Sequence, residues 1–307
     1  MKAVHSFKSA RFKPMLESIG GTYIIKPMVQ IMALSAASIR KHHPDFVLIT
    51  DEAGKALAEA CKMPYSEIIS VGDKFDSHPN FWIHSKLHAY HELNEPFVHY
   101  DNDVFLWEPL PERLLAADVF GFHSETFVWR KYEAYGKALE DSGIPIPKLH
   151  RKYWTSRMPV NMAIFGGNNH AAIKQYAGFV LEWLQDNQGF WNMDDKQAQA
   201  LDENIAFIEQ LWVSYLIQDA QGIPIELLLT EQQVQANEKV DGVQLTHLHG
   251  AKQAAMRQGK THELVAKLDA KLKEVNPEVH AAVQEFTSPD VDIAALIKES
   301  QDGQNSQ

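Results

Sequence analysis

The chain has 307 residues, of which 45% are hydrophobic and 22% are charged, as in an ordinary globular enzyme. Its 29 basic and 40 acidic side chains give a formal net charge of −11, which argues against nucleic acid as the main partner. The single cysteine, Cys61, excludes an internal disulfide and any multi-cysteine zinc site.

Short strands and helices alternate over the first 125 residues. Continuous apolar runs predict buried strands, and apolar residues at helical spacing predict helices. The strands are expected at 2–7, 46–50, 67–71, 97–105 and 118–122, and the helices at 28–40, 55–62, 81–93 and 109–117. This alternation predicts an α/β fold with a mainly parallel sheet and helices on both faces, in which ligands bind at the carboxyl ends of the strands.

The pattern after Ser124 is more helical. It predicts helices at 127–140, 170–188, 203–217, 261–275 and 290–300, and strands at 160–167, 225–229 and 243–248. We expect one catalytic domain over residues 1–253 and a helical C-terminal extension over 254–300. Residues 301–307 lack apolar side chains, which predicts a disordered tail.

The N-terminal segment Met1–Phe12 is basic, but no apolar segment follows it, so no signal peptide is expected. No apolar run reaches the roughly 18 residues that a membrane-spanning helix needs. We therefore expect a cytoplasmic protein without a membrane span.

The apolar run that begins at Phe97 ends in Asp101-Asn102-Asp103. Two carboxylates at the end of a buried strand are costly unless a cation or several donors offset their charge. Alternate side chains of a strand point the same way, so both carboxylates can converge on Mg²⁺ or Mn²⁺. The alternative is a turn with two solvated carboxylates, because Asp and Asn favour turns.

Two segments carry polar residues that suit the same chemistry. Lys86 lies on the helix before the Asp-x-Asp strand and can reach phosphates or sugar hydroxyls near a cation. The alternative for Lys86 is a solvated surface lysine. Asn161 begins a strand that ends in Gly166-Gly167, where a backbone can approach a ligand closely. An ordinary strand and turn would give the same pattern.

A late histidine pair offers a further ligand. Strand alternation places His247 and His249 on one side of a strand end, beside Gly250. A neutral imidazole can complete the coordination of a borderline ion such as Mn²⁺. A packed, hydrogen-bonded histidine is the alternative.

In their order along the chain, these segments resemble the motifs of GT-A nucleotide-sugar glycosyltransferases, above all the family-8, glycogenin-like retaining members. Asp101-Asn102-Asp103 resembles the Asp-x-Asp motif, and Lys86-Leu87 is similar to the basic residue and leucine that precede it. The segment 161–167 resembles the strand that lines the sugar pocket. The segment 247–250 matches the late His-x-x-Gly motif, although the Lys-Pro-Trp ending of that motif is absent.

The resemblance implies metal-dependent transfer of a sugar from a nucleoside diphosphate, with UDP as the first candidate, to a saccharide or another hydroxyl acceptor. It implies that Asp101, Asp103 and His247 bind Mn²⁺ or Mg²⁺. Residues expected to act in catalysis are Asp101, Asp103, Glu209 and Gln210. Residues expected at the donor are His5, Ser6, Phe7, Asp51, Lys86, Asn102, Asn161, Gly166, Gly250 and Lys252. Residues expected at the acceptor are Phe122, His123, Tyr153 and Trp154.

Some of these residues have a structural alternative. Asp51 follows a strand, where it can hydrogen-bond a base or ribose, but it is equally suited to cap the next helix. Phe122, His123, Tyr153 and Trp154 offer a stacking floor for an acceptor sugar, but aromatic residues also pack in cores.

Two other functions fit part of the pattern. Asp101-Asn102-Asp103-Val104 matches part of the haloacid-dehalogenase phosphatase motif, in which the first aspartate attacks phosphorus. That motif normally opens its fold, whereas several βα units precede it here, and the later acidic pair Asp194-Asp195 follows no apolar strand. The other alternative is a nucleotide- or sugar-binding relative without turnover.

Overall fold

The computed structural model describes residues 1–9, 22–72, 83–125, 129–141, 159–187, 209–230, 232–233, 245–248, 258 and 260–288. The chain divides into two compact units that alternate along the sequence. Unit 1 comprises Met1–Lys2, Asp76–Tyr100 and Leu110–Gly242, and unit 2 comprises Ala3–Phe75, Asp101–Pro109 and Val243–Gln307. The chain therefore passes from unit 1 to unit 2 at the first residue of the Asp-x-Asp segment.

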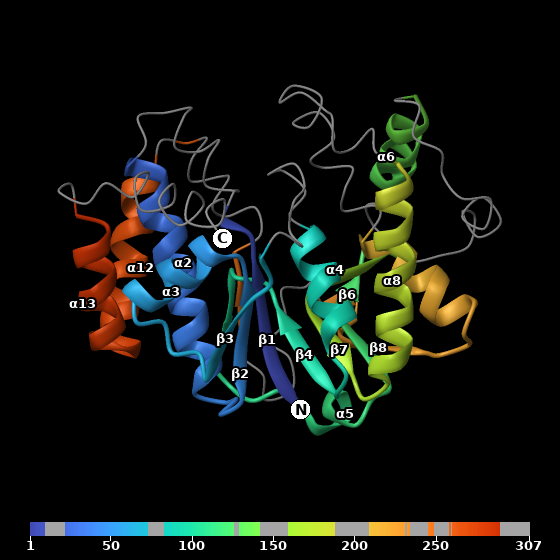
Figure 1. Cartoon of the computed structure of the whole chain (residues 1–307), viewed down its shortest axis with the longest axis horizontal. Coiled ribbons are helices and arrows are strands. Elements are labelled where there is room, and N and C mark those ends of the chain that lie inside the picture. Colours follow the sequence, from blue (N-terminus) through green and yellow to red (C-terminus); the bar gives the residue numbers. More distant parts are fainter. Residues whose placement is uncertain are drawn as a thin grey trace. The chain divides into compact units, whose positions relative to one another are not determined.

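The architecture is the predicted α/β fold. Seven strands follow the order β3-β2-β1-β4-β7-β6-β8 (Figure 1). Their bounds are β1 Lys2–Phe7, β2 Phe46–Thr50, β3 Glu67–Ser70, β4 Phe97–Tyr100, β6 Val119–Ser124, β7 Val160–Gly167 and β8 Ile225–Leu229. The ladders β1–β2, β2–β3 and β6–β8 are parallel, whereas β7 runs antiparallel to both β4 and β6.

In unit 2, the apolar runs of β1 and β2 lie in the core, with Val4 opposite Val47. Among the residues described, the helices of this unit are α2 Thr22–Arg40, α3 Glu52–Ala60, α12 Thr261–Val275 and α13 Pro277–Phe286. Figure 1 shows α12 and α13 packed beside α2. A separate two-stranded sheet pairs β5 Val104–Leu106 with β9 Leu245–His247.

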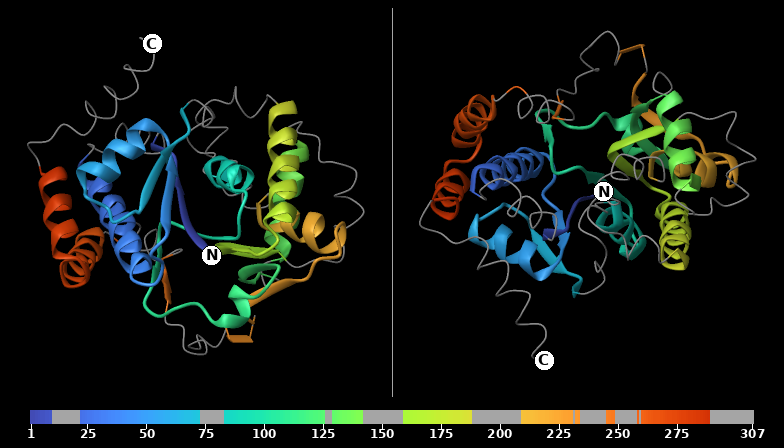
Figure 2. Two further views of the ribbon diagram at one scale, coloured as in Figure 1. Left: turned by 60° about the horizontal axis from the view of Figure 1, so that its bottom comes forward. Right: turned by 90° about the horizontal axis from the view of Figure 1, so that it is seen from above.

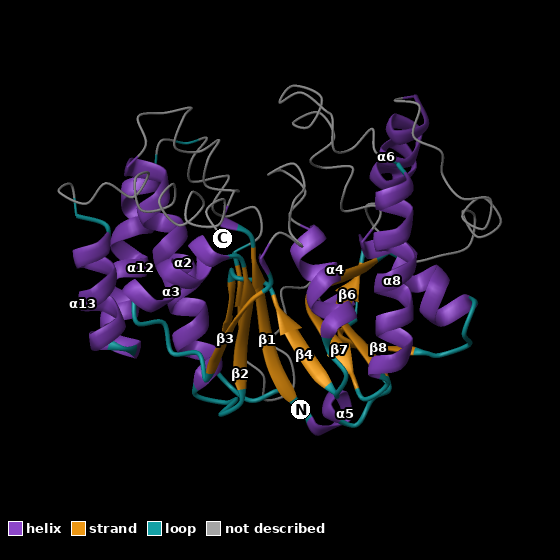
Figure 3. Cartoon of the chain, in the orientation of Figure 1, coloured by secondary structure: helices purple, strands orange, loops and turns teal. Residues whose placement is uncertain are grey.

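In unit 1, β4, β7, β6 and β8 are neighbours in that order (Figure 3). The helices are α4 Ile83–Glu92, α5 Glu112–Leu115, α6 Trp129–Asp141, α8 His170–Asp186 and the π-helical segment η5 Ser214–Asp219. The views in Figure 2 show α4 beside α8, which pack closely. The β4–β7 pair brings Gly166 against Phe97, so a Cβ at Gly166 would collide with the Phe97 carbonyl oxygen.

The observed elements differ from the predicted ones in several places. The strand expected at 97–105 is two strands, β4 and β5, because a turn interrupts the run at Asp101. The helix expected at 55–62 begins at Glu52, because Asp51 caps its N-terminus. Helix α13 was not predicted, although Asn276 caps it and Pro277 stands at its start. The helix expected at 290–300 lies outside the described residues. Among the helices described, none is long and apolar enough to cross a membrane.

Candidate functional site

The Asp-x-Asp segment forms a turn between β4 and β5. The Val104 N–H donates to the Asp101 carbonyl over 3.0 Å, which closes a four-residue turn with Asn102 and Asp103 inside it. The sequence analysis attributed the orientation of the two carboxylates to the alternation of side chains along a strand. This explanation is wrong, because the two residues lie in a turn. The solvated-turn alternative is wrong for Asp103, which is 8% exposed.

Backbone pairing in unit 2 brings His247 beside this turn. Strands β5 and β9 are antiparallel, with Val104 opposite His247. The Leu248 N–H donates to the Asp103 carbonyl over 3.1 Å, which extends the pairing by one residue into the turn. The chain thus joins residues 101–104 to a segment more than a hundred positions later.

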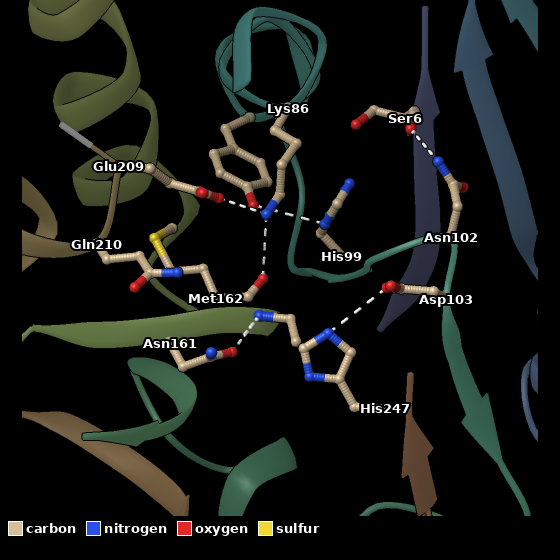
Figure 4. A network of polar contacts seen from close by, with 12 residues as sticks. Ser6, Lys86, His99, Asn102, Asp103, Asn161, Met162, Glu209, Gln210 and His247 are labelled. Carbon is tan, nitrogen blue, oxygen red and sulfur yellow. Dashed lines mark hydrogen bonds and ion pairs between the residues drawn. The ribbon is translucent and has the colours of Figure 1, made fainter. Parts of the chain in front are cut away.

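Side chains of Asp101, Asp103 and His247 converge at this point. One ligand atom from each lies within 4.8 Å of the others. His247 Nε2 is 3.5 Å from Asp103 Oδ1, as Figure 4 shows for these two residues. Two carboxylates held this close repel one another unless positive charge offsets them. Two oxygens and one imidazole nitrogen are a donor set that fits a divalent cation, and the nitrogen favours Mn²⁺ over Mg²⁺.

Asn102, between the two aspartates, is anchored to β1. Its Nδ2 donates to the Ser6 carbonyl over 2.8 Å (Figure 4). Its Oδ1 is buried and accepts no hydrogen bond from any described residue. A buried acceptor without a donor costs about 1–3 kcal/mol, so Asn102 Oδ1 is an unusual group to find beside these carboxylates.

The other predicted donor residues of unit 2 have structural roles. His5 is fully buried, and its ring nitrogens contact Tyr65 Oη at 2.9 Å and Ser35 Oγ at 3.2 Å. Phe7 is buried, and its carbonyl accepts from Thr50 Oγ1 over 2.9 Å. Contact of these side chains with a donor stays a prediction.

Asp51 is the N-cap of α3. One carboxylate oxygen accepts from the Gly54 N–H over 2.8 Å, and the other accepts from the backbone and the hydroxyl of Ser9. The capping alternative describes this residue, and its predicted contact with base or ribose stays a prediction.

Unit 1 holds a second polar cluster, centred on Lys86. The solvated-surface alternative for Lys86 is wrong, because the side chain is 5% exposed and forms an ion pair with Glu209, which is fully buried. Lys86 Nζ also donates to the Met162 carbonyl over 3.3 Å (Figure 4). Tyr176 Oη donates to the Glu209 carbonyl over 2.9 Å, which anchors the helical backbone at this acid.

The same cluster continues through Glu125, which the sequence analysis did not single out. Asn161 Nδ2 donates to Glu125 Oε1 over 2.6 Å, and Tyr132 Oη donates to Glu125 Oε2 over 2.5 Å. Tyr132 Oη also contacts Gln210 Oε1. Burial, with the nearby Glu125 carboxylate, raises the pKa of Tyr132 far above its usual value. Unit 1 therefore brings together four predicted residues: Lys86, Asn161, Glu209 and Gln210.

The remaining predicted residues divide into two groups. Phe122 and His123 are buried in β6, and the His123 ring donates through Nδ1 to the Ser124 carbonyl over 2.9 Å. This is the packing alternative for both, and their contact with an acceptor stays a prediction. Tyr153, Trp154, His249, Gly250 and Lys252 lie outside the described residues.

A profile described as "Family of unknown function (DUF6734)" matches residues 1–286 of this sequence. The chain belongs to this family. No curated protein matches the sequence.

The solved structures to which this chain is similar include several transferases. One is the galactosyltransferase LgtC in complex with donor and acceptor sugar analogs, at 13% identity and a TM-score of 0.42, covering 87% of this chain and 96% of that one. Another is mouse xyloside xylosyltransferase 1 in its apo form, at 12% identity and a TM-score of 0.38, covering 80% and 96%. A third is the glycosyltransferase GlyE of Streptococcus pneumoniae TIGR4, at 9% identity and a TM-score of 0.38, covering 99% and 63%.

Proposed function

We propose that the chain is a divalent-cation-dependent glycosyltransferase that moves a sugar from a nucleoside diphosphate, with UDP as the first candidate, to a saccharide or other hydroxyl acceptor. The convergence of Asp101, Asp103 and His247 carries the proposal. The His247 imidazole favours the transferase over the phosphatase alternative. In the phosphatase the first aspartate attacks phosphorus as a nucleophile, whereas here both aspartates and an imidazole form one set of cation ligands.

The three side chains have a common role in this proposal. Asp101, Asp103 and His247 hold Mn²⁺ or Mg²⁺ through two oxygens and one nitrogen. When bound, a divalent cation supplies the positive charge that stabilises a departing diphosphate. Asp103 is also the most buried of the three, so its charge is the least screened by water.

Asn102 adds a group that a nucleotide can satisfy. Its Nδ2 is held by Ser6, and this fixes the amide so that Oδ1 remains an acceptor for an incoming hydroxyl or N–H. A donor molecule that supplies such a group relieves the cost of the buried acceptor only when it binds. We assign Asn102 to donor binding on this basis.

The Lys86 cluster of unit 1 is assigned to the donor sugar by its resemblance to the transferase motifs. Glu209 and Lys86 neutralise each other, and Asn161 and Gln210 are linked through Glu125 and Tyr132. Hydrogen-bonding side chains fixed in this way lose little entropy when they bind sugar hydroxyls. Lys86→Ala is therefore expected to weaken nucleotide-sugar binding about tenfold or more, since a charged hydrogen bond contributes about 1.5–3 kcal/mol.

Calorimetry of the full chain tests the proposal. UDP is titrated in Mn²⁺ and in EDTA, using wild type, Asp103→Ala, and Asp45→Asn as an exposed acidic control in unit 2. We expect binding in Mn²⁺ only, lost in Asp103→Ala and retained in the control. Equal UDP affinity in EDTA and Mn²⁺ would contradict the assignment.

Turnover separates the alternatives. UDP-, GDP- and CDP-sugars are incubated with Mn²⁺ and candidate saccharides, and the released nucleotide is measured. Release that needs Mn²⁺ and Asp103 supports a transferase, and binding without release indicates a non-catalytic relative. Hydrolysis of a generic phosphate monoester, with no response to nucleotide sugars, indicates a phosphatase.

A further inference from the structure

A chain of buried hydrogen bonds lies behind the Asp101–Val104 turn. Tyr65 Oη is 2.9 Å from His5 Nδ1, His5 Nε2 is 3.2 Å from Ser35 Oγ, and Ser35 Oγ is 2.6 Å from the Val104 carbonyl oxygen. All four residues belong to unit 2. His5, Ser35 and Val104 are fully buried, so water cannot replace the His5–Ser35 and Ser35–Val104 contacts, whereas Tyr65 is half-buried.

The chemistry of the groups fixes the direction of this chain. A carbonyl oxygen only accepts, so Ser35 must donate its single hydroxyl hydrogen to Val104. Ser35 Oγ can then only accept from His5, which requires the imidazole hydrogen on Nε2. In a neutral imidazole Nδ1 is then the acceptor, and Tyr65 donates to it, so that each donor of the chain has one acceptor.

The surroundings of His5 support that neutral form. Burial lowers the pKa of His5 from 6.5 to about 3, although the nearby Asp103 carboxylate opposes this change. A neutral imidazole with both nitrogens engaged cannot rotate without breaking a buried hydrogen bond, which makes His5 a rigid link between Tyr65 and Ser35.

The Val104 carbonyl is the group through which this link acts on the turn. The Leu248 N–H bonds the Asp103 carbonyl, so the opposed pair Val104 and His247 is a non-hydrogen-bonded pair whose backbone groups face away from β9. Ser35 supplies the partner that β9 cannot. Val104 is therefore held on two sides: its N–H donates to the Asp101 carbonyl, and its carbonyl accepts from Ser35. Its neighbour Asp103 bonds the Leu248 N–H.

A second serine of α2 provides a comparison. Ser38 Oγ accepts from the Leu106 N–H over 3.1 Å and donates to the Ser35 carbonyl over 2.9 Å. Ser38 is as buried as Ser35 and contacts the same strand, but its contact is two residues farther along β5 from the aspartates. Comparing the two serines therefore distinguishes a general effect on the stability of β5 from a specific effect on the geometry of the turn.

We infer that Tyr65, His5 and Ser35 are positioning residues, which set the backbone of the Asp101–Val104 turn so that its carboxylates and His247 converge on one divalent cation. The inference rests on the proposed function, since it concerns the cation site of that function. His5 thus acts from the core behind the site, whereas the sequence analysis expected it at the donor.

The experiment measures Mn²⁺ binding alone, by the loss of the free Mn²⁺ paramagnetic resonance signal, on the full-length chain. The variants are Ser35→Ala, its matched control Ser38→Ala, Tyr65→Phe, and Asp103→Asn as the variant without a functional site. Thermal unfolding in EDTA reports the stability of each. Alanine is smaller than serine, so neither serine variant introduces a clash.

We expect both serine variants to lose stability, because each leaves buried polar groups without a partner. Ser35→Ala should weaken Mn²⁺ binding about three- to tenfold, which is the range that the loss of one buried hydrogen bond gives. Ser38→Ala should weaken Mn²⁺ binding less than about twofold. Tyr65→Phe, at the far end of the chain, should weaken binding about twofold.

Equal weakening in both serine variants would overturn the inference, because it would show that Ser35 only supports β5. Wild-type affinity in Ser35→Ala would also overturn it, while leaving the proposed function intact. A wild-type chain that binds no more Mn²⁺ than Asp103→Asn would overturn the inference and the proposed function together.

Discussion

The two polar clusters of this molecule balance their charges in opposite ways. In unit 1, the buried acid Glu209 has the buried base Lys86 directly against it. In unit 2, the turn brings the carboxylates of Asp101 and Asp103 together with the imidazole of His247. The first arrangement is compensated within the fold, whereas the second gathers groups of one charge that an added cation would neutralise. A cluster of the second kind is the better indicator of a ligand.

The largest effect is expected when the compensated cluster is broken. Lys86→Ala leaves Glu209 buried without its cation, which should lower the free energy of unfolding by about 3–5 kcal/mol. Urea denaturation measures this. Lys174→Ala is the matched control, because Lys174 lies in the same unit but is only half-buried, and it donates to the exposed side chain of Asn94. A loss below about 1 kcal/mol in Lys86→Ala, as expected for an exposed pair, would remove the contrast between the clusters.

Acid should act on unit 2 through its buried histidines. Burial lowers the pKa of His5 to about 3 and that of His43 to about 4. Between these values and 6.5 the unfolded chain binds a proton that the folded chain does not, so stability falls as the pH falls. Each histidine should contribute about 1.4 kcal/mol per pH unit.

Denaturation at pH 6.5, 5.5 and 4.5 measures that slope. His43→Gln should reduce the slope of stability against pH by the contribution of one proton. The contribution of His5 should remain. An unchanged slope in His43→Gln would show that this imidazole is not held neutral by the fold, and would place the acid sensitivity elsewhere.

Most elements of the fold were predictable, because local pattern decided them. The bounds of β2, β7 and α12 agree with the sequence prediction, since each is a continuous apolar run or a periodic helix with clear ends. The prediction of one strand over 97–105 was wrong, because the turn closed by the Asp101–Val104 hydrogen bond divides the two apolar runs. Helix α13 was missed even though the Asn276-Pro277 pair is a helix-start signal.

The site was predictable only in part. Motif order identified Asp101, Asp103 and His247, and the structure brings them together through β5–β9 pairing. Tertiary packing decides the rest. Nothing in the sequence near Lys86 shows that it is buried against Glu209, 123 positions away by residue number, and nothing near Glu125 shows that Asn161 and Tyr132 donate to it.

The smallest effect should come from relieving the repulsion between the Asp101 and Asp103 carboxylates in the metal-free chain. Asp101→Asn keeps an oxygen acceptor at the same place and removes one of two like charges, so in EDTA and low salt it should raise the free energy of unfolding by about 0.2–0.5 kcal/mol. Asp45→Asn controls for the lower net charge, because it removes an exposed acid of the same unit. The gain should disappear at about 1 M salt, where the screening length is about 3 Å. A loss of more than about 1 kcal/mol in Asp101→Asn would contradict the comparison, since it would mean that this carboxylate, like Glu209, is compensated within the fold.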